Sequence, residues 1–211
     1  MEAKRGDDLV HQDLPLRLYG DPQLVQGVIG YALHLDGNNQ YLDVGRHADE
    51  CLGNLQKCTN GLTVSAWLNF KDYSENMYIL STGNDGIRMY QKGGETVAVV
   101  HQNGKEWEVS VPNLERQAWH YVELSWHPDF GLNMYVNNTL VAHSSFTNVV
   151  PNVRKPGARV LVGRANDGDT GETTRTAMMI VDEMEVWYGR REGLVAFDYI
   201  LRGRSWNDVA D

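Results

Sequence analysis

The sequence predicts an all-β fold in which two antiparallel sheets pack face to face, and three observations lead to it. Apolar and polar residues alternate with period two in many short segments between Tyr31 and Tyr188. Groups of Gly, Asn, Asp and Pro separate these segments, as expected for tight turns. The chain has 211 residues, 42% of them hydrophobic, which is enough to bury one core between two sheets.

The clearest strand is LTVSAWLNF, residues 62–70. Its apolar alternate residues would share one face, and the residues between them would share the other. The same alternation predicts strands at YALHL (31–35), YLDV (41–44), MYILS (77–81), IRMYQ (87–91), TVAVVHQ (96–102), EWEVSV (106–111), WHYVELSW (119–126), LNMYVN (132–137), LVAHS (140–144), ARVLVG (158–163), AMMIV (177–181) and MEVWY (184–188).

The two ends of the chain are expected to differ from its middle. Residues 1–17 begin with a polar, charged stretch and are predicted to be loosely ordered, whereas residues 18–211 form the folded domain. In GLVAFDYILRG (193–203), Leu194, Phe197 and Leu201 have helical spacing, and Gly203 could stop a helix. A short C-terminal helical segment is therefore expected.

The charge balance narrows the choice of partners. The chain has 19 Lys and Arg against 28 Asp and Glu, a net charge of −9, which disfavours nucleic acids and anionic membranes. Crossing a bilayer takes roughly 20 consecutive apolar residues, and no run in the chain approaches that length. No membrane insertion by this segment is expected.

Several segments occur in an order that resembles a known family. They are GYALHLDGNNQYLDVG, GLTVSAWLNF, AWHYVELSWHPDFGLNMYVNNTLVA, LVGRAND and MIVDEMEVWYGR. Over about residues 15–203 they resemble the laminin-G/pentraxin-like domains of the concanavalin-A-like jelly-roll superfamily. The resemblance implies a jelly-roll sandwich. It does not choose a function, because the superfamily includes adhesion modules, pentraxins, lectins and glycan-cleaving enzymes. Trp67 and Trp119 are expected to anchor the core.

The segment DEMEV (182–186) comes nearest to a catalytic motif. Laminarinase-like relatives place three acidic residues in register on a concave sheet. Regular alternation would put Glu183 and Glu185 on one face and Asp182 on the other. Position 187 is Trp and position 181 is Val, so the third acid is missing. The chain is therefore predicted not to be an enzyme.

Calcium is the cofactor that the loops would suit, because they are rich in carboxylate and amide oxygens. The resemblance implies a first placement, in which Asp36 and Asp182 meet with backbone carbonyls such as those of Gly37 or Asn39. A second placement lies at the rim, on Asn166, Asp167 and Asp169 of RANDGDTGET. Both placements stay open on the sequence alone.

Two local features bear on the compartment. Cys51 and Cys58 are the only cysteines, and their loop-like surroundings favour a local disulfide over two free thiols. Asn137 begins an Asn-Asn-Thr glycosylation acceptor at the tip of a predicted two-residue hairpin. Together they predict an extracellular or cell-surface location.

The leading hypothesis is a non-catalytic adhesion or ligand-binding module of a larger cell-surface or matrix protein. It would bind a protein or glycan through rim loops at residues 82–86, 103–105, 127–131 and 164–176, with calcium assisting. The alternative is a carbohydrate-active lectin or glycosidase that uses the concave sheet, with Trp107, Tyr90 and Tyr135 available to stack on sugars. A spacer without a ligand site is a third hypothesis.

Overall fold

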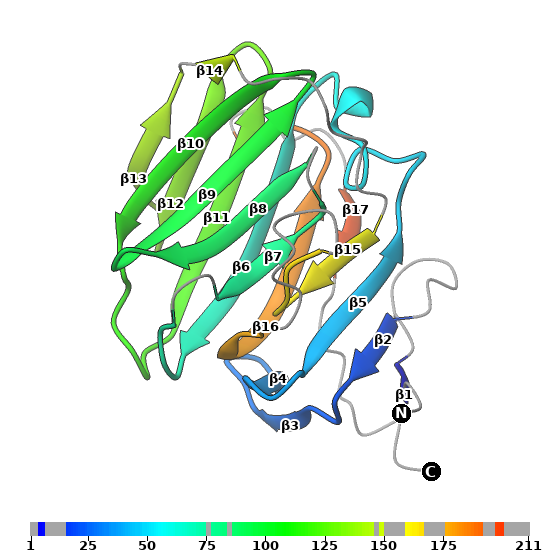
Figure 1. The fold of residues 1–211 in the computed structure, drawn as a ribbon, viewed down its shortest axis with the longest axis vertical. Coiled ribbons are helices and arrows are strands. Elements are labelled where there is room, and N and C mark those ends of the chain that lie inside the picture. The colour runs from blue at the N-terminus through cyan, green and yellow to red at the C-terminus, as the bar shows by residue number, and fades with distance from the viewer. Residues whose placement is uncertain are drawn as a thin grey trace.

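The chain folds into two antiparallel sheets that enclose one core, as the sequence predicts (Figure 1). The computed structural model describes residues 4–6, 16–74, 77–83, 86–145, 148–149, 159–166, 176–191 and 197–200, with only the backbone for Lys4–Gly6 and Phe197–Ile200. Among these residues the helical structure comprises a 3-10 turn, η1 (Leu55–Lys57). No described segment forms a helix with the length and hydropathy needed to cross a membrane.

Sheet A has nine strands and sheet B has eight, and every strand pairing is antiparallel. In spatial order, sheet A consists of β1 (Lys4–Gly6), β2 (Leu16–Tyr19), β5 (Tyr41–Arg46), β15 (Arg159–Val162), β7 (Tyr78–Ser81), β8 (Ile87–Lys92), β9 (Glu95–Gln102), β10 (Lys105–Pro112) and β14 (Asn148–Val149). Sheet B consists of β13 (Thr139–Ser144), β12 (Gly131–Val136), β11 (His120–His127), β6 (Leu62–Phe70), β16 (Met178–Trp187), β4 (Tyr31–Asp36) and β3 (Gln23–Gln26), and β17 (Phe197–Ile200) pairs with β16.

Strand β6 shows how the sequence pattern positions the functional side of the molecule. Its apolar alternate residues, from Leu62 to Phe70, belong to the core between the sheets. The other face of β6 is not simply exposed, because Thr63 and Ser65 are buried as well. The Thr63 hydroxyl donates to the Gly189 carbonyl at 2.8 Å, and Thr63 Oγ1 lies 3.0 Å from Ser125 Oγ, whose hydroxyl can donate to it. At Thr63, the outer side of β6 therefore takes part in buried polar contacts between β6, β11 and the segment after β16.

Two tryptophans cross the core, and they are not the two that the resemblance implied. Trp107 on β10 and Trp126 on β11 are each 1% exposed, and their rings meet edge to face with centroids 5.4 Å apart. Trp67 and Trp119 are only half-buried, so the prediction that they anchor the core is wrong. Trp67 lies on the odd-numbered side of β6, which faces away from the core.

The predicted C-terminal helical segment is wrong for residues 197–200, which form β17. β4 pairs with the Met178–Val181 part of β16, which leaves the later part of that edge open. β17 pairs there, with Glu185 opposite Ile200 and Trp187 opposite Phe197. The β17 segment is rich in aromatic and β-branched residues, which favour strands. Its pairing with β16 therefore prevails over its helical spacing. The sequence analysis also left β2 and β3 unassigned.

Tyr73 gives the fold a specific dependence on alkaline pH. Its hydroxyl donates to the Leu114 carbonyl, and burial raises its pKa to about 12, opposed by the positive charge of Arg116. An unfolded tyrosine has a pKa of about 10. The neutral phenol therefore contributes stability that is fully present below about pH 10 and is lost as the pH rises towards about 12.

We expect Tyr73→Phe to flatten the decline in the free energy of unfolding between about pH 10 and 12, because the raised pKa is then absent. Urea titrations at several pH values would measure the slope. Tyr31→Phe, which changes an exposed phenol, is the control. An unchanged slope in Tyr73→Phe would contradict the expectation.

Candidate binding face

The outer face of sheet B brings together polar and aromatic side chains from three adjacent strands. Register places Trp67 of β6 between Tyr121 and Asp182, Ser65 between Glu123 and Glu185, and Thr63 between Ser125 and Trp187. Residues opposite one another in antiparallel strands project on the same side of the sheet. We call this set the outer-face site: Thr63, Ser65, Trp67, Tyr121, Glu123, Ser125, Asp182, Glu185 and Trp187.

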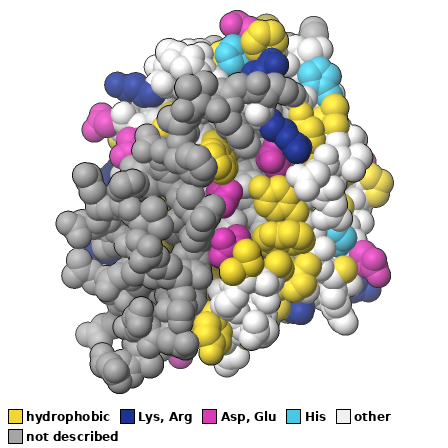
Figure 2. All heavy atoms as spheres, turned by 180° about the vertical axis from the view of Figure 1, so that it is seen from behind, with side chains coloured by type: hydrophobic (Ala, Val, Ile, Leu, Met, Phe, Trp, Pro, Cys, Tyr) yellow, Lys and Arg dark blue, Asp and Glu magenta, His cyan; other side chains and the backbone are white. Residues whose placement is uncertain are grey.

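An aromatic pair forms the accessible part of the outer-face site. The rings of Trp67 and Tyr121 lie 5.4 Å apart at 54°, and both side chains are half-buried. Burial raises the pKa of Tyr121, with smaller contributions from the negative charges of Glu123 and Glu185. Seen from behind, hydrophobic side chains gather along the middle of the molecule with acidic ones beside them (Figure 2). An aromatic surface edged by hydrogen-bonding groups can stack on the apolar face of a sugar ring and bind its hydroxyl groups.

Arg191 closes one side of this site. Its guanidinium lies 4.2 Å from the ring centroid of Tyr135, and its Nε is 3.5 Å from Glu123 Oε1. Its backbone N–H donates to Ser125 Oγ at 2.8 Å, and its Nη2 donates to Asn138 Oδ1 at 3.3 Å. Glu123, 7% exposed, therefore faces a cation rather than open solvent. Tyr135 is also covered, which leaves the half-buried Trp67, Tyr121 and Trp187 as the aromatic residues of the site.

The acidic residues of β16 are arranged differently from the sequence prediction. An irregularity in register between Asp182 and Glu185 places Asp182 opposite Trp67 and Glu185 opposite Ser65. Trp67 and Ser65 are two residues apart, so Asp182 and Glu185 share the outer face. The prediction that Glu183 shares a face with Glu185, and Asp182 does not, is wrong. The physical cause is a β-bulge, in which Glu183 has a φ of +45° and its N–H donates to Asp182 Oδ1 at 2.9 Å.

The structure does not bring Asp36 and Asp182 together. Asp36 pairs with Met178, four residues before Asp182 on β16, which corresponds to about 13 Å along a strand. Asp182 Oδ2 instead accepts the N–H groups of Val28 and Ile29, at 2.8 and 3.1 Å. Asp36 Oδ1 accepts the N–H of Asn38 at 2.7 Å.

The backbone of the same turn is also engaged. The Gly37 carbonyl accepts the Thr176 hydroxyl at 2.6 Å, and the Asn39 N–H donates to Thr176 Oγ1 at 3.0 Å. The residues of the first calcium placement are separated, so they do not fit one ion. This placement of Asp36, Gly37, Asn39 and Asp182 is therefore corrected, because β-sheet register holds the carboxylates apart.

We expect Asp182→Ala to lower the free energy of unfolding by about 2 kcal/mol, because it removes a charged acceptor from backbone N–H groups. The loss should be the same in calcium and in chelator. Asp36→Ala, which removes one exposed local bond, should behave nearly as the wild type. Thermal melts of both variants with and without calcium measure this. A calcium-dependent shift that both variants abolish would contradict the correction.

The second calcium placement falls largely outside the described residues, since Asp167 and Asp169 lie there. Asn166 is described, and its Nδ2 donates to the Arg159 carbonyl at 2.7 Å. Within the described part of the chain, no three His, Cys, Asp or Glu residues gather closely enough to hold a metal ion. Calcium binding at the rim stays a prediction.

The compartment markers have clear positions. Cys51 and Cys58 are joined by a disulfide, and both are buried against the core rather than lying on the surface. Asn137 is exposed at the β12–β13 turn, where Asn137 and Asn138 have φ values of +50° and +66°. Two successive left-handed residues are what a tight two-residue hairpin requires. The acceptor Asn137 is thus at a hairpin tip, and its glycosylation stays a prediction.

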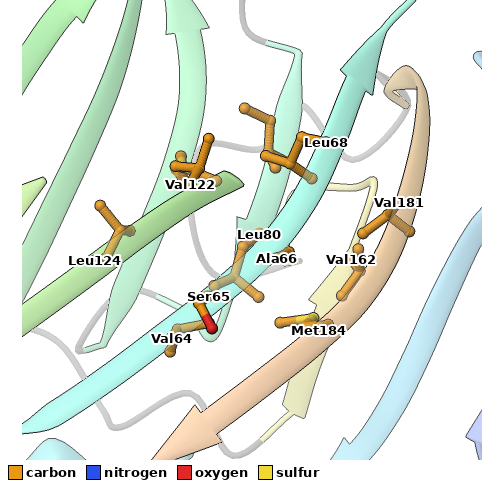
Figure 3. A pocket seen from close by; sticks show the side chains of 12 residues that line it. Val64, Ser65, Ala66, Leu68, Leu80, Val122, Leu124, Val162, Val181 and Met184 are labelled. Atoms are coloured by element: carbon orange, nitrogen blue, oxygen red, sulfur yellow. The ribbon is translucent and has the colours of Figure 1, made fainter. Parts of the chain in front are cut away.

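The interior holds a small apolar pocket that belongs to the core (Figure 3). Side chains of β6, β11 and β16 meet Leu80 and Val162 of sheet A around it. Apart from Ser65, its lining is apolar, so it offers almost nothing to orient a polar ligand. Of the three aromatic residues considered for sugar stacking, Trp107 is in the core, Tyr90 stacks on Tyr78 in sheet A, and Tyr135 lies under Arg191. They form no common platform.

Sequence reasoning missed Glu123 and Arg191. The alternation in β11 did place Tyr121, Glu123 and Ser125 on one side, so combining the non-core sides of adjacent strands could have found Glu123. No local signal marks Arg191, because its contacts come from residues 53 to 68 positions away.

A family model described as the concanavalin A-like lectin/glucanases superfamily, of laminin G type, matches residues 36–192. The chain belongs to this superfamily. The match spans most of the described sandwich, from β4 to the Arg191 segment, and confirms the resemblance seen in the strand motifs. The superfamily contains both lectins and glucanases, so membership in it does not determine the function of this chain. The function has to be inferred from the site.

Individual relatives share the fold at low identity. A non-toxic nonhemagglutinin of type E from Clostridium botulinum is 25% identical over 135 residues, which are 62% of this chain and 11% of that protein. The binding domain of botulinum neurotoxin DC in complex with rat synaptotagmin II superposes with a TM-score of 0.56 at 11% identity. A botulinum neurotoxin type C structure, described as dependent on interaction with two ganglioside molecules for cell entry, superposes with a TM-score of 0.57 at 12% identity. Each structural match covers 83% of this chain and 43% of the other. This superfamily member thus spans less than half of those binding domains.

Proposed function

We propose that this chain is a non-catalytic recognition module that binds glycans through the outer-face site. The observation that carries the proposal is the half-buried Trp67–Tyr121 pair, which lies on the same face of sheet B as the half-buried Glu185. Aromatic rings stack on the apolar faces of sugars, while a carboxylate accepts hydrogen bonds from the sugar hydroxyls and a phenol can donate or accept one. The ganglioside-dependent relative supports the same ligand class.

The arrangement of the acids supports recognition over hydrolysis. Glycoside hydrolysis needs two carboxylates that flank the scissile bond, one of them free to act as acid or nucleophile. Asp182 is 4% exposed and its carboxylate accepts backbone N–H groups, so it is not free for such a role. Residue 180, on the same side of β16, is Ile and supplies no further carboxylate. We therefore expect no turnover of β-glucans by the wild type, and no change in that result for Glu185→Gln.

An extracellular or cell-surface setting is part of the proposal. It is supported by the Cys51–Cys58 disulfide, by the exposed Asn137 acceptor and by the similarity to a botulinum neurotoxin binding domain. Calcium at the Asn166 rim remains a separate proposal, testable by glycan binding with and without chelator.

We expect Trp67→Ala to weaken glycan binding at least tenfold, because the stacking surface is removed while the core is untouched. A glycan array would select the ligand, and titration of the soluble glycan would measure its affinity. Phe130→Ala is the control, since this 56% exposed aromatic lies on the β11–β12 turn, at the opposite end of β11 from the Trp67–Tyr121 pair. An array without any bound glycan, or a loss in Phe130→Ala alone, would overturn the outer-face assignment.

A second candidate is protein recognition through the rim. Phe130 there packs against His127, with ring centroids 4.8 Å apart, and Arg190 lies 4.2 Å over its ring. Exposed aromatic residues beside arginine are typical of energetic centres in protein interfaces. The relative solved with synaptotagmin II supports a protein ligand as well. Selective loss of protein capture in Phe130→Ala would favour this candidate.

A further inference from the structure

The β3–β4 hairpin ends in an exposed apolar turn, residues 27–30, which we call the hairpin tip. Its two apical side chains, Val28 and Ile29, are 40% and 56% exposed. Leu24 on β3 and Tyr31 on β4 are 41% and 39% exposed directly beside it. The apolar surface therefore extends from the apex onto both strands, and of the outer-face site only the Asp182 carboxylate contacts the hairpin tip, through its backbone.

Three of the four backbone N–H groups of the hairpin tip donate to acceptors within the protein. The N–H groups of Val28 and Ile29 both donate to Asp182 Oδ2, and the Gly27 N–H donates to the Gly30 carbonyl at 3.0 Å. Gly30 O also accepts Gln26 Nε2 at 3.1 Å. Moving a backbone N–H out of water is costly only when it loses its partner. These donors can leave water without losing theirs.

The hairpin tip is also held in one shape. A Cβ added to Gly27 would come within 2.4 Å of Asp182 Oδ2, so the carboxylate packs directly on the glycine backbone. Gly30 has a φ of +66°, which favours glycine. Asp182 belongs to β16 in the centre of sheet B and is 4% exposed. The sheet therefore presents the two aliphatic side chains in a preset position, which lowers the ordering cost of binding.

The charge around the hairpin tip indicates what it contacts. Residues 22–35 contain no Asp, Glu, Lys or Arg, although the whole chain carries a net charge of −9. Entry of this stretch into an apolar medium removes no charged side chain from water. Tyr31, an amphipathic aromatic, lies where the hairpin would meet a boundary between apolar and polar media, as tyrosines do at lipid interfaces. The hairpin tip has no charged side chain of its own, and the Asp182 carboxylate that contacts it is 4% exposed and bonded to its backbone N–H groups. Such a convex apolar tip suits hydrocarbon, which offers no directional bonds.

We infer that the hairpin tip inserts Val28 and Ile29 into the apolar layer of an electrically neutral lipid surface. Tyr31 then lies at the level of the headgroups, and the acidic remainder of the protein stays in water. This contact is peripheral, and it revises the expectation of no membrane insertion, which was based on spanning length and net charge. It uses residues other than Trp67 and Tyr121 and does not depend on the proposed glycan site.

Cosedimentation with phosphatidylcholine vesicles tests the inference. Wild-type protein is expected to partition onto the vesicles, and the double variant Val28→Ser/Ile29→Ser to lose at least tenfold in its partition coefficient. Leu140→Ser/Val141→Ser is the matched control, because these aliphatic residues are 51% and 43% exposed on the opposite edge of sheet B. The control is expected to partition as the wild type. Circular dichroism would establish that all three proteins are folded.

A second readout reports insertion directly. A solvent-sensitive fluorophore on Ile29→Cys should shift to the blue with vesicles, and the same label on Leu140→Cys should not. Absence of wild-type partitioning, or equal losses in both double variants, overturns the inference. A fall in the sedimentation coefficient of the lipid-free double variant, with no vesicle binding by the wild type, would instead assign the hairpin tip to a second copy of this chain. Trp67→Ala should retain vesicle binding, which separates this result from a failure of the glycan proposal.

Discussion

Trp107→Ala is expected to lower the free energy of unfolding by about 3–5 kcal/mol, the range for a large aromatic residue truncated in a packed core. Trp107 on β10 of sheet A is 1% exposed and meets Trp126 on β11 of sheet B edge to face. Truncation leaves a cavity at the point where the two sheets touch and removes this ring contact. Urea titration followed by far-ultraviolet circular dichroism would measure the loss.

Trp67→Ala is the matched control for this prediction. It removes the same side chain from the half-buried outer face, so it should destabilise the protein clearly less than Trp107→Ala. Equal losses would mean that Trp67 supports the core as strongly as Trp107, and would argue against its place in a ligand site.

Replacing the disulfide by Cys51→Ala/Cys58→Ala is expected to lower the free energy of unfolding by about 2–3 kcal/mol. The bridge joins residues seven positions apart, and the loss follows from the restored freedom of this loop in the unfolded chain. The same urea titration measures it. Reductant should shift the wild type towards the variant and leave the variant unchanged. A variant as stable as the wild type would show that core packing alone holds the loop.

Much of the fold followed from side-chain alternation, because the pattern in a strand is local. The inner residues of β6, from Leu62 to Phe70, were predicted as one face, and they lie in the core. β17 could not be predicted in this way. Its residues have helical spacing, and only the open edge of β16 makes them a strand. β3 was missed as well, because a four-residue strand at a sheet edge carries almost no periodic signal.

The candidate site was harder to predict than the fold, because its geometry depends on one irregularity. Alternation along DEMEV assigns Glu183 and Glu185 to one face. Because of the bulge in β16, Asp182 and not Glu183 lies on the same face as Glu185. The register with β6 then places Asp182 beside Trp67. A bulge inserts one residue without a clear mark in the sequence, so every side assignment after it changes. Arg191 could not be predicted either, since its partners are distant in the chain.

The sequence by itself determined the two-sheet sandwich, the superfamily and the two-residue turn at Asn137, because each of these depends on neighbouring residues and their order. Only the tertiary structure decided what the acidic residues do. It separates Asp36 from Asp182, places Asp182 under the N–H groups of Val28 and Ile29, and pairs Glu123 with Arg191. The physical reason is that a carboxylate takes its role from the donors and charges that the fold brings to it, and these come from other strands.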